Sequence, residues 1–149
     1  MVSIDLIKQL REETGISVGE CKKALEQAEG DMVKAKELLR AWGKEVPSRK
    51  QKREVQEGMV EAYVHAKGKI GAMVQVRCET DFVSRSDDFK NLCHELALQV
   101  VSMDPEDVSS LLDQQYVRDT SRTIRNLTEE MIAKLGENIV VERFIRFEL

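Results

Sequence analysis

The sequence predicts an α+β protein with an N-terminal three-helix bundle, a linker, and then a three-stranded antiparallel sheet with helices on one face. Two observations carry this prediction. Up to residue 43 the apolar residues recur at three- and four-residue spacing, which is typical of amphipathic helices. From Gly58 the spacing becomes two, which is typical of strands that bury one face. We therefore divide the 149 residues into a helical module (1–43), a linker (44–55) and a core domain (56–149).

Three short helices are predicted in the helical module. The first ends at Gly15, because glycine readily adopts the left-handed conformation that closes a helix. The second begins at Ser17, where a hydroxyl cap followed three residues later by Glu20 forms a capping box. The third carries an apolar stripe over Met32–Trp42, which we expect to be bundle core and not a ligand site. A module this small suits docking on another protein better than holding an active site.

The core domain begins with a predicted β-hairpin. Its turn is Lys67-Gly68-Lys69, and its second strand places the apolar residues on one face. These residues are Ile70, Ala72, Val74, Val76 and Cys78. A helix follows from about Ser86, with Asp87 and Asp88 in its first turn, where the helix dipole favours acidic side chains.

One more helix and one more strand are predicted towards the C-terminus. Residues 106–119 are acidic and weakly periodic, so we expect a short helix and a loop there. The helix spans about Arg122–Leu135 and the strand Asn138–Phe147. Strict alternation along this strand would put one set of residues on a common face: Ile139, Val141, Arg143, Ile145 and Phe147. Both faces are partly apolar, which indicates that a helix covers one and a second subunit the other.

The charge distribution argues against direct binding of nucleic acid. The net charge is −4, whereas nucleic-acid-binding proteins usually present a dominant basic face. Only the linker, residues 44–55, is distinctly basic, and we expect it to be a solvated connector. No run of about 18 apolar residues and no signal-peptide pattern is visible. We therefore expect no membrane contact and a cytoplasmic protein, or a processed form that has lost its presequence.

The residue types needed for catalysis or metal binding are not arranged for either. Cys21, Cys78 and Cys93 are widely spaced and form no CxxC motif. His94 follows Cys93 directly, so on a helix the two side chains diverge by about 100° and do not easily share a metal. No carboxylate pair, nucleophile–base pair or phosphate-binding glycine loop is visible. We expect no catalytic residues, no metal and no cofactor.

Residues 78–89, CETDFVSRSDDF, join the end of a predicted strand to the start of a helix. Periodicity alone gives this corner ordinary structural roles. If the strand continued, Phe82 would share the core face with Val76 and Cys78. Asp81 would be a turn or cap residue. The pattern therefore favours a buried Phe82.

Four stretches of the chain together resemble bacterial-type elongation factor Ts. They are IKQLREETG (7–15), ECKKALEQAEGDMVKAKELLR (20–40), CETDFVSRSDDF (78–89) and KLGENIVVERFIRFEL (134–149). The members of this family are guanine nucleotide exchange factors for elongation factor Tu. The resemblance implies an N-terminal module similar to ubiquitin-associated domains, a linker, and a core of antiparallel sheet with helices. It also implies a protein without bond-making chemistry of its own.

The resemblance implies a role for the TDFV segment, which consists of Thr80, Asp81, Phe82 and Val83. In the family this segment is a probe that enters the GTPase domain of elongation factor Tu near its magnesium and phosphate site. Asp81 and Phe82 lead the insertion. On this basis Phe82 is a functional residue and points out of the fold, which reverses the expectation from periodicity.

A second contact implied by the resemblance lies in the helical module. The first helix and the turn into the second dock on the same GTPase domain, and the matching positions here are Arg11, Val18 and Gly19. Many family members carry two methionines in place of Val18 and Gly19, so we expect a smaller contact in this chain. From the pattern alone, Arg11 is equally well explained as an exposed helix residue.

The length of the chain bears on its assembly. Longer family members have two tandem core halves and a protruding coiled coil, and short members pair two chains to rebuild the double core. The resemblance therefore implies a homodimer, in agreement with the two apolar faces of the last strand. Two other classes of function stay open: an adaptor that holds another protein through its helical module, and a Cys/His enzyme.

Overall fold

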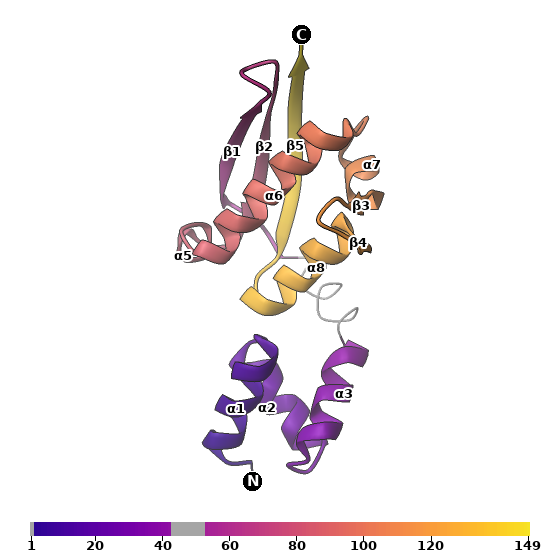
Figure 1. The fold of residues 1–149 in the computed structure, drawn as a ribbon. Helices are drawn as coiled ribbons and strands as arrows, with labels where there is room; N and C mark the ends of the chain where they lie inside the picture. Colours follow the sequence, from indigo (N-terminus) through magenta and orange to yellow (C-terminus); the bar gives the residue numbers. More distant parts are fainter. Residues whose placement is uncertain (1, 43–52) are drawn as a thin grey trace.

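The structure, a computed structural model, describes residues 2–42 and 53–149 (Figure 1). Three helices precede a three-stranded antiparallel sheet with helices on one face, which confirms the predicted fold class. The helices are α1 (Ile4–Thr14), α2 (Val18–Gln27), α3 (Met32–Trp42), α5 (Asp81–Ser84), α6 (Asp87–Met103), α7 (Val108–Asp113) and α8 (Ile124–Leu135). The strands are β1 (Glu57–His65), β2 (Ile70–Cys78), β3 (Gln115–Tyr116), β4 (Asp119–Thr123) and β5 (Ile139–Glu148). Most of the predicted linker, residues 44–52, lies outside the described residues.

The three N-terminal helices enclose a small hydrophobic core of their own. The predicted caps at Gly15 and Ser17 are present. Ser17 accepts a hydrogen bond from the Glu20 amide at 3.4 Å, and Gly15 closes α1 in the left-handed conformation with φ of 71°. The buried apolar residues are Leu10, Cys21, Ala24, Leu25, Ala28, Ala35 and Leu39. Among the described helices, in 2–42 and 53–149, none is long and apolar enough to cross a membrane.

The main sheet has the strand order β1–β2–β5, so the last strand of the chain lies beside the second strand of the hairpin. The hairpin agrees with the predicted one: β2 buries Ala72, Val74, Val76 and Cys78 on a single face. α6 runs across this face (Figure 1). Its buried side chains include Phe89, Leu92, Leu96 and Val100, and they form one continuous core with those of β2. This core holds the two elements that meet at the corner of residues 78–89.

A β-bulge in β5 overturns the predicted facing of that strand. Glu142 is an extra residue, because neighbouring residues of β2 pair with Val141 and Arg143. Val141 faces the core before the bulge, and Phe144 packs against the core after it. Ile145 consequently faces away from α6. The prediction of one strictly alternating face is therefore wrong. The extra residue shifts the alternation by one position, and a repeat of two residues in the sequence does not reveal such a shift.

A small second sheet occupies part of the region predicted as a short helix and a loop. α7 is that short helix, but β3 and β4 form a hairpin after it, and α8 begins at Ile124 instead of Arg122. The buried amide of Gln99 holds this hairpin: it donates to the carbonyl of Gln115 at 3.0 Å and accepts from the N–H of Val117 at 3.0 Å. Short polar strands have no apolar alternation, so the sequence pattern does not reveal them.

Candidate interaction site

The corner between β2 and α6 is the candidate site, and it lies at the outer edge of the sheet in Figure 1. β2 ends at Cys78, and Thr80 caps the single helical turn α5. The side chains of successive helix residues point about 100° apart. Phe82 and Val83 therefore face different directions. Val83 is 5% exposed, whereas Phe82 is 80% exposed. Phe82 therefore points out of the fold, while Val83 anchors the turn in the core.

The periodicity-based expectation of a buried Phe82 is wrong, because the chain leaves the strand before it reaches this residue. Cys78 is the last residue of β2, and its thiol donates a hydrogen bond to the Thr80 carbonyl at 3.2 Å. The backbone then turns into α5, so the alternation of the strand no longer applies. The outward direction of Phe82 agrees with the direction that the family resemblance implies.

Glu137, in the loop between α8 and β5, fixes the start of this turn. Its carboxylate accepts hydrogen bonds from the Glu79 N–H at 3.1 Å, the Thr80 N–H at 3.0 Å and the Thr80 hydroxyl at 2.7 Å. The same hydroxyl accepts the Val83 N–H at 3.4 Å. The sequence pattern does not reveal Glu137, because this residue is 57 residues from Thr80 along the chain and only the pairing of β2 with β5 brings it to the corner.

Asp81 lies beside Phe82 on the same exposed turn. Its carboxylate pairs with the Arg85 guanidinium at 3.2 Å, and both side chains are largely exposed. An exposed pair with this spacing on a helix contributes only about 0.3–0.5 kcal/mol. Asp81 can therefore exchange Arg85 for another partner at a small cost in free energy.

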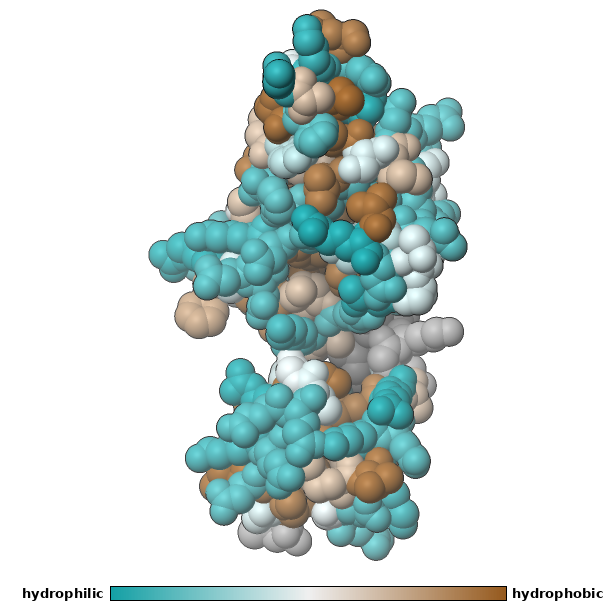
Figure 2. All heavy atoms as spheres, viewed as in Figure 1, coloured by the Kyte–Doolittle hydropathy of each residue, from teal (hydrophilic) through white to brown (hydrophobic). Residues whose placement is uncertain are grey.

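The residues predicted for docking lie on the surface of the helical module. Arg11 is exposed in the last turn of α1, and Val18 is 49% exposed at the start of α2. Apart from its chain neighbours and its own helix backbone, no heavy atom of the described residues lies within 4 Å of the position that a Cβ would occupy on Gly19. The first turn of α2 thus presents a small open surface. Hydrophilic side chains cover much of the visible face of this module (Figure 2).

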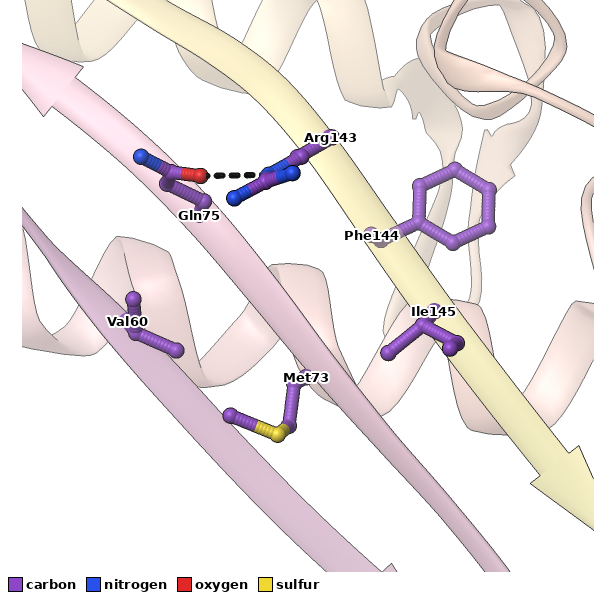
Figure 3. A pocket seen from close by; sticks show the side chains of 6 residues that line it. All are labelled: Val60, Met73, Gln75, Arg143, Phe144 and Ile145. Atoms are coloured by element: carbon purple, nitrogen blue, oxygen red, sulfur yellow. Dashed lines mark hydrogen bonds between the residues drawn. The ribbon is translucent and has the colours of Figure 1, made fainter.

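The sheet face opposite α6 exposes a second apolar surface, which we call the open face. Its most exposed large apolar members are Val60, Met73, Ile145, Phe147 and Val64, with exposed fractions between 48% and 69%. A shallow cavity of about 380 Å³ lies among the first three of them (Figure 3). Gln75 and Arg143 border this cavity, and the Arg143 Nε donates to the Gln75 Oε1 at 2.7 Å. One hydrogen bond therefore joins these two polar side chains within the face.

The three cysteines are poorly suited to nucleophilic chemistry. Cys21, Cys78 and Cys93 are all buried and free. Burial raises the pKa of Cys78 to about 11 and that of Cys93 to about 12, and it also raises the pKa of Cys21. The nucleophilic thiolate is therefore scarce at neutral pH. Within residues 2–42 and 53–149, no three His, Cys, Asp or Glu side chains are grouped to hold a metal ion.

Comparisons with known proteins identify one family. A family model described as elongation factor TS matches residues 79–149, a range that begins at the corner. Elongation factor Ts of Coprothermobacter proteolyticus is 42% identical, with 99% of this chain and 98% of that protein covered. The chain belongs to the elongation factor Ts family. Elongation factor Ts of Thermotoga maritima is 39% identical, with coverage of 99% and 96%, and that of Thermoanaerobacter pseudethanolicus is 37% identical, with coverage of 99% and 95%.

One feature distinguishes this chain from these elongation factor Ts relatives. The alignment with the Coprothermobacter proteolyticus protein extends over 193 positions, whereas this chain has 149 residues. That relative therefore contains residues between the aligned ends that have no counterpart here. Similarity to elongation factor Ts thus extends along nearly the whole chain, and the missing residues are internal to the alignment.

Replacing Phe82 should leave the stability of this elongation factor Ts family member nearly unchanged. We expect Phe82→Ala to alter the free energy of unfolding by no more than about 0.5 kcal/mol, because the side chain is exposed. Phe89→Ala should cost about 3–5 kcal/mol, because it leaves a cavity in the core. Urea unfolding followed by circular dichroism measures both. A loss above about 2 kcal/mol for Phe82→Ala would contradict the outward placement.

The cysteines should be protected from alkylation in the folded protein. Because each folded-state pKa is raised, the thiolate fraction at about pH 8 lies below that of the unfolded chain. We expect iodoacetamide to label all three residues much more slowly in buffer than in urea, as measured by mass spectrometry after timed quenching. Rapid labelling of one cysteine in the folded protein would instead reveal an activated thiol and support the enzyme alternative.

Proposed function

We propose that this chain is a guanine nucleotide exchange factor that binds elongation factor Tu·GDP and promotes GDP release, so that GTP can bind during protein synthesis. The observation that carries the proposal is Phe82, which is exposed on one helical turn at the strand–helix corner of a chain from the elongation factor Ts family. Burying a phenylalanine side chain is favourable by about 2 kcal/mol. A partner that receives Phe82 gains this free energy, which the fold itself leaves unused.

In the proposed complex, the TDFV segment inserts near the magnesium and phosphate site of elongation factor Tu. Phe82 separates packed elements of the partner, and Asp81 competes for groups that hold the magnesium shell. Thr80 and Val83 hold the segment on the fold, the exposed Thr80 through hydrogen bonds and the buried Val83 through core packing. The chain supplies binding free energy and makes or breaks no covalent bond.

Nucleotide release then follows from thermodynamic linkage. A factor that weakens GDP binding by a given ratio has its own binding weakened by GDP in the same ratio. A coupling free energy of about 3 kcal/mol corresponds to more than a hundredfold. Only contacts that differ between the GDP-bound and the nucleotide-free partner contribute to this coupling. Burial of Phe82 supplies about 2 kcal/mol, and Asp81, through its competition for the magnesium shell, supplies the remainder.

The helical module is proposed to provide the docking contact, through Arg11, Val18 and Gly19, on the GTPase domain of the same partner. Its separate hydrophobic core supports a division into a docking module (1–43) and a core domain (56–149), joined by the basic linker between them. The net charge of −4 favours a protein partner over direct contact with nucleic acid.

Two chains are proposed to pair through their open faces as a homodimer. The exposed apolar side chains of this face surround a shallow cavity that the matching face of a second copy can fill (Figure 3). One polar contact within the face is already made before pairing, because the Arg143 Nε donates to the Gln75 Oε1. Two-fold pairing of identical patches is the commonest arrangement of homo-oligomers.

The exchange function is tested by GDP release from elongation factor Tu, followed with a fluorescent GDP analogue. Catalytic amounts of this chain should accelerate release. Phe82→Ala should slow the accelerated rate by about tenfold or more, which corresponds to losing most of the 2 kcal/mol of burial. Met103→Ala, an exposed apolar control at the far end of α6, should not change it. Binding without acceleration would favour the adaptor alternative.

The dimer is tested by light scattering at micromolar concentration. The wild-type chain should give a mass near twice 17.0 kDa. Met73→Lys should give the single-chain mass, because the substitution places a charge in the middle of the open face. Val33→Lys, at an exposed site on α3, should remain dimeric. A single-chain mass for the wild type would remove this part of the proposal.

A further inference from the structure

Two carboxylates tie the ends of β2 and β5 together in opposite directions. Glu137 accepts hydrogen bonds from Glu79 and Thr80 on the β2 side. Glu79 in turn accepts one from the Asn138 N–H on the β5 side at 2.6 Å. The Glu79 carboxylate also lies 3.8 Å from the Arg53 guanidinium, but it bonds to no cap of α5. The tie made by Glu137 reaches further, because it includes the hydroxyl that caps α5.

The direction of the hydrogen bonds at Thr80 follows from the chemistry of its partner. A carboxylate can only accept hydrogen bonds, so the Thr80 hydroxyl is the donor in its hydrogen bond to Glu137. A lone pair of the hydroxyl is then directed to the Val83 N–H, which is the N-cap bond of α5. Donation to an anion also makes a hydroxyl a stronger acceptor. Glu137 thereby sets where α5 begins, and hence where Phe82 points.

We propose that Glu137 is a positioning residue for nucleotide exchange, which acts through Thr80 to present Phe82 in a single direction. This inference rests on the proposed exchange function. Glu137 itself is not part of the inserted segment. Its loss should therefore lower the maximal rate of GDP release, while the concentration of factor at half-maximal rate changes little, because the docking residues Arg11 and Val18 belong to the separate helical module.

The test is a set of variants at both ends of the hydrogen bond, assayed by GDP release from elongation factor Tu over a range of factor concentrations. Glu137→Ala and Thr80→Val should each lower the maximal rate by about tenfold, with the half-maximal concentration within about twofold. Thr80→Ser keeps the hydroxyl and should restore the wild-type rate. The double variant should be no slower than either single variant, because all three lack the same interaction.

Glu79→Ala provides the matched control. It removes the hydrogen bond to the Asn138 N–H and the ion pair with Arg53, and leaves the bonds between Glu137 and Thr80 in place. We expect it to lower the melting temperature yet keep the maximal rate of release. All rates are compared at a temperature at which circular dichroism shows every variant to be folded.

The outcomes distinguish the positioning role of Glu137 from the exchange function. If the wild type accelerates release and Glu137→Ala does so at the same maximal rate, the positioning role is overturned and the exchange function stands. If Glu137→Ala and Glu79→Ala lower the maximal rate of release equally, the effect belongs to strand pairing in general, and the positioning role is likewise overturned. A wild-type chain that does not accelerate release overturns the exchange function, and the positioning role with it.

Discussion

The packing of α6 against β2 is the interaction on which the rest of the structure depends. Phe89 of α6 and Val76 of β2 belong to one continuous core. Because both elements that leave the corner are held in this core, the residues between them have little freedom to move. Val83 belongs to the same core and anchors the residues of the corner to it. The exposure of Phe82 is thus a consequence of a well-packed interior, not of a loose surface loop.

A rigid support has an energetic advantage for insertion, the role proposed for Phe82. Ordering a mobile segment on binding costs free energy that is subtracted from the affinity. Here the carboxylate of Glu137, the Thr80 cap and the buried Val83 have ordered the segment before any partner arrives. The remaining cost is confined largely to the two side-chain torsions of Phe82. The weak Asp81–Arg85 pair leaves the second exposed group free to change partners.

Local pattern predicted much of this fold, because its signals are local. The caps at Ser17 and Ser86, the closing Gly15 and the alternation of β2 each depend on residues a few positions apart. The failures have equally physical causes. Phe82 does not follow the alternation of β2, because the N-cap of α5 at Thr80 comes before it and ends the strand.

Two further features depend on contacts that no short window of sequence contains. The bulge at Glu142 is defined only by the pairing of β5 with β2. Glu137 reaches Thr80 for the same reason, so its role is visible only once the strands are assembled. In the sequence it is one glutamate after a glycine in a polar turn. Periodicity thus predicted the frame of the candidate site, the family resemblance predicted its exposed residues, and the hydrogen bonds that hold them required the structure.

The most direct measurement is a photo-crosslink from position 82 itself. The chain is made with p-benzoylphenylalanine in place of Phe82, mixed with nucleotide-free elongation factor Tu and irradiated, and the crosslinked peptides are mapped by mass spectrometry. The account predicts crosslinks to the GTPase domain beside its magnesium and phosphate site, and their loss when excess GDP is added. Crosslinks that map elsewhere, or that persist unchanged in GDP, would contradict it.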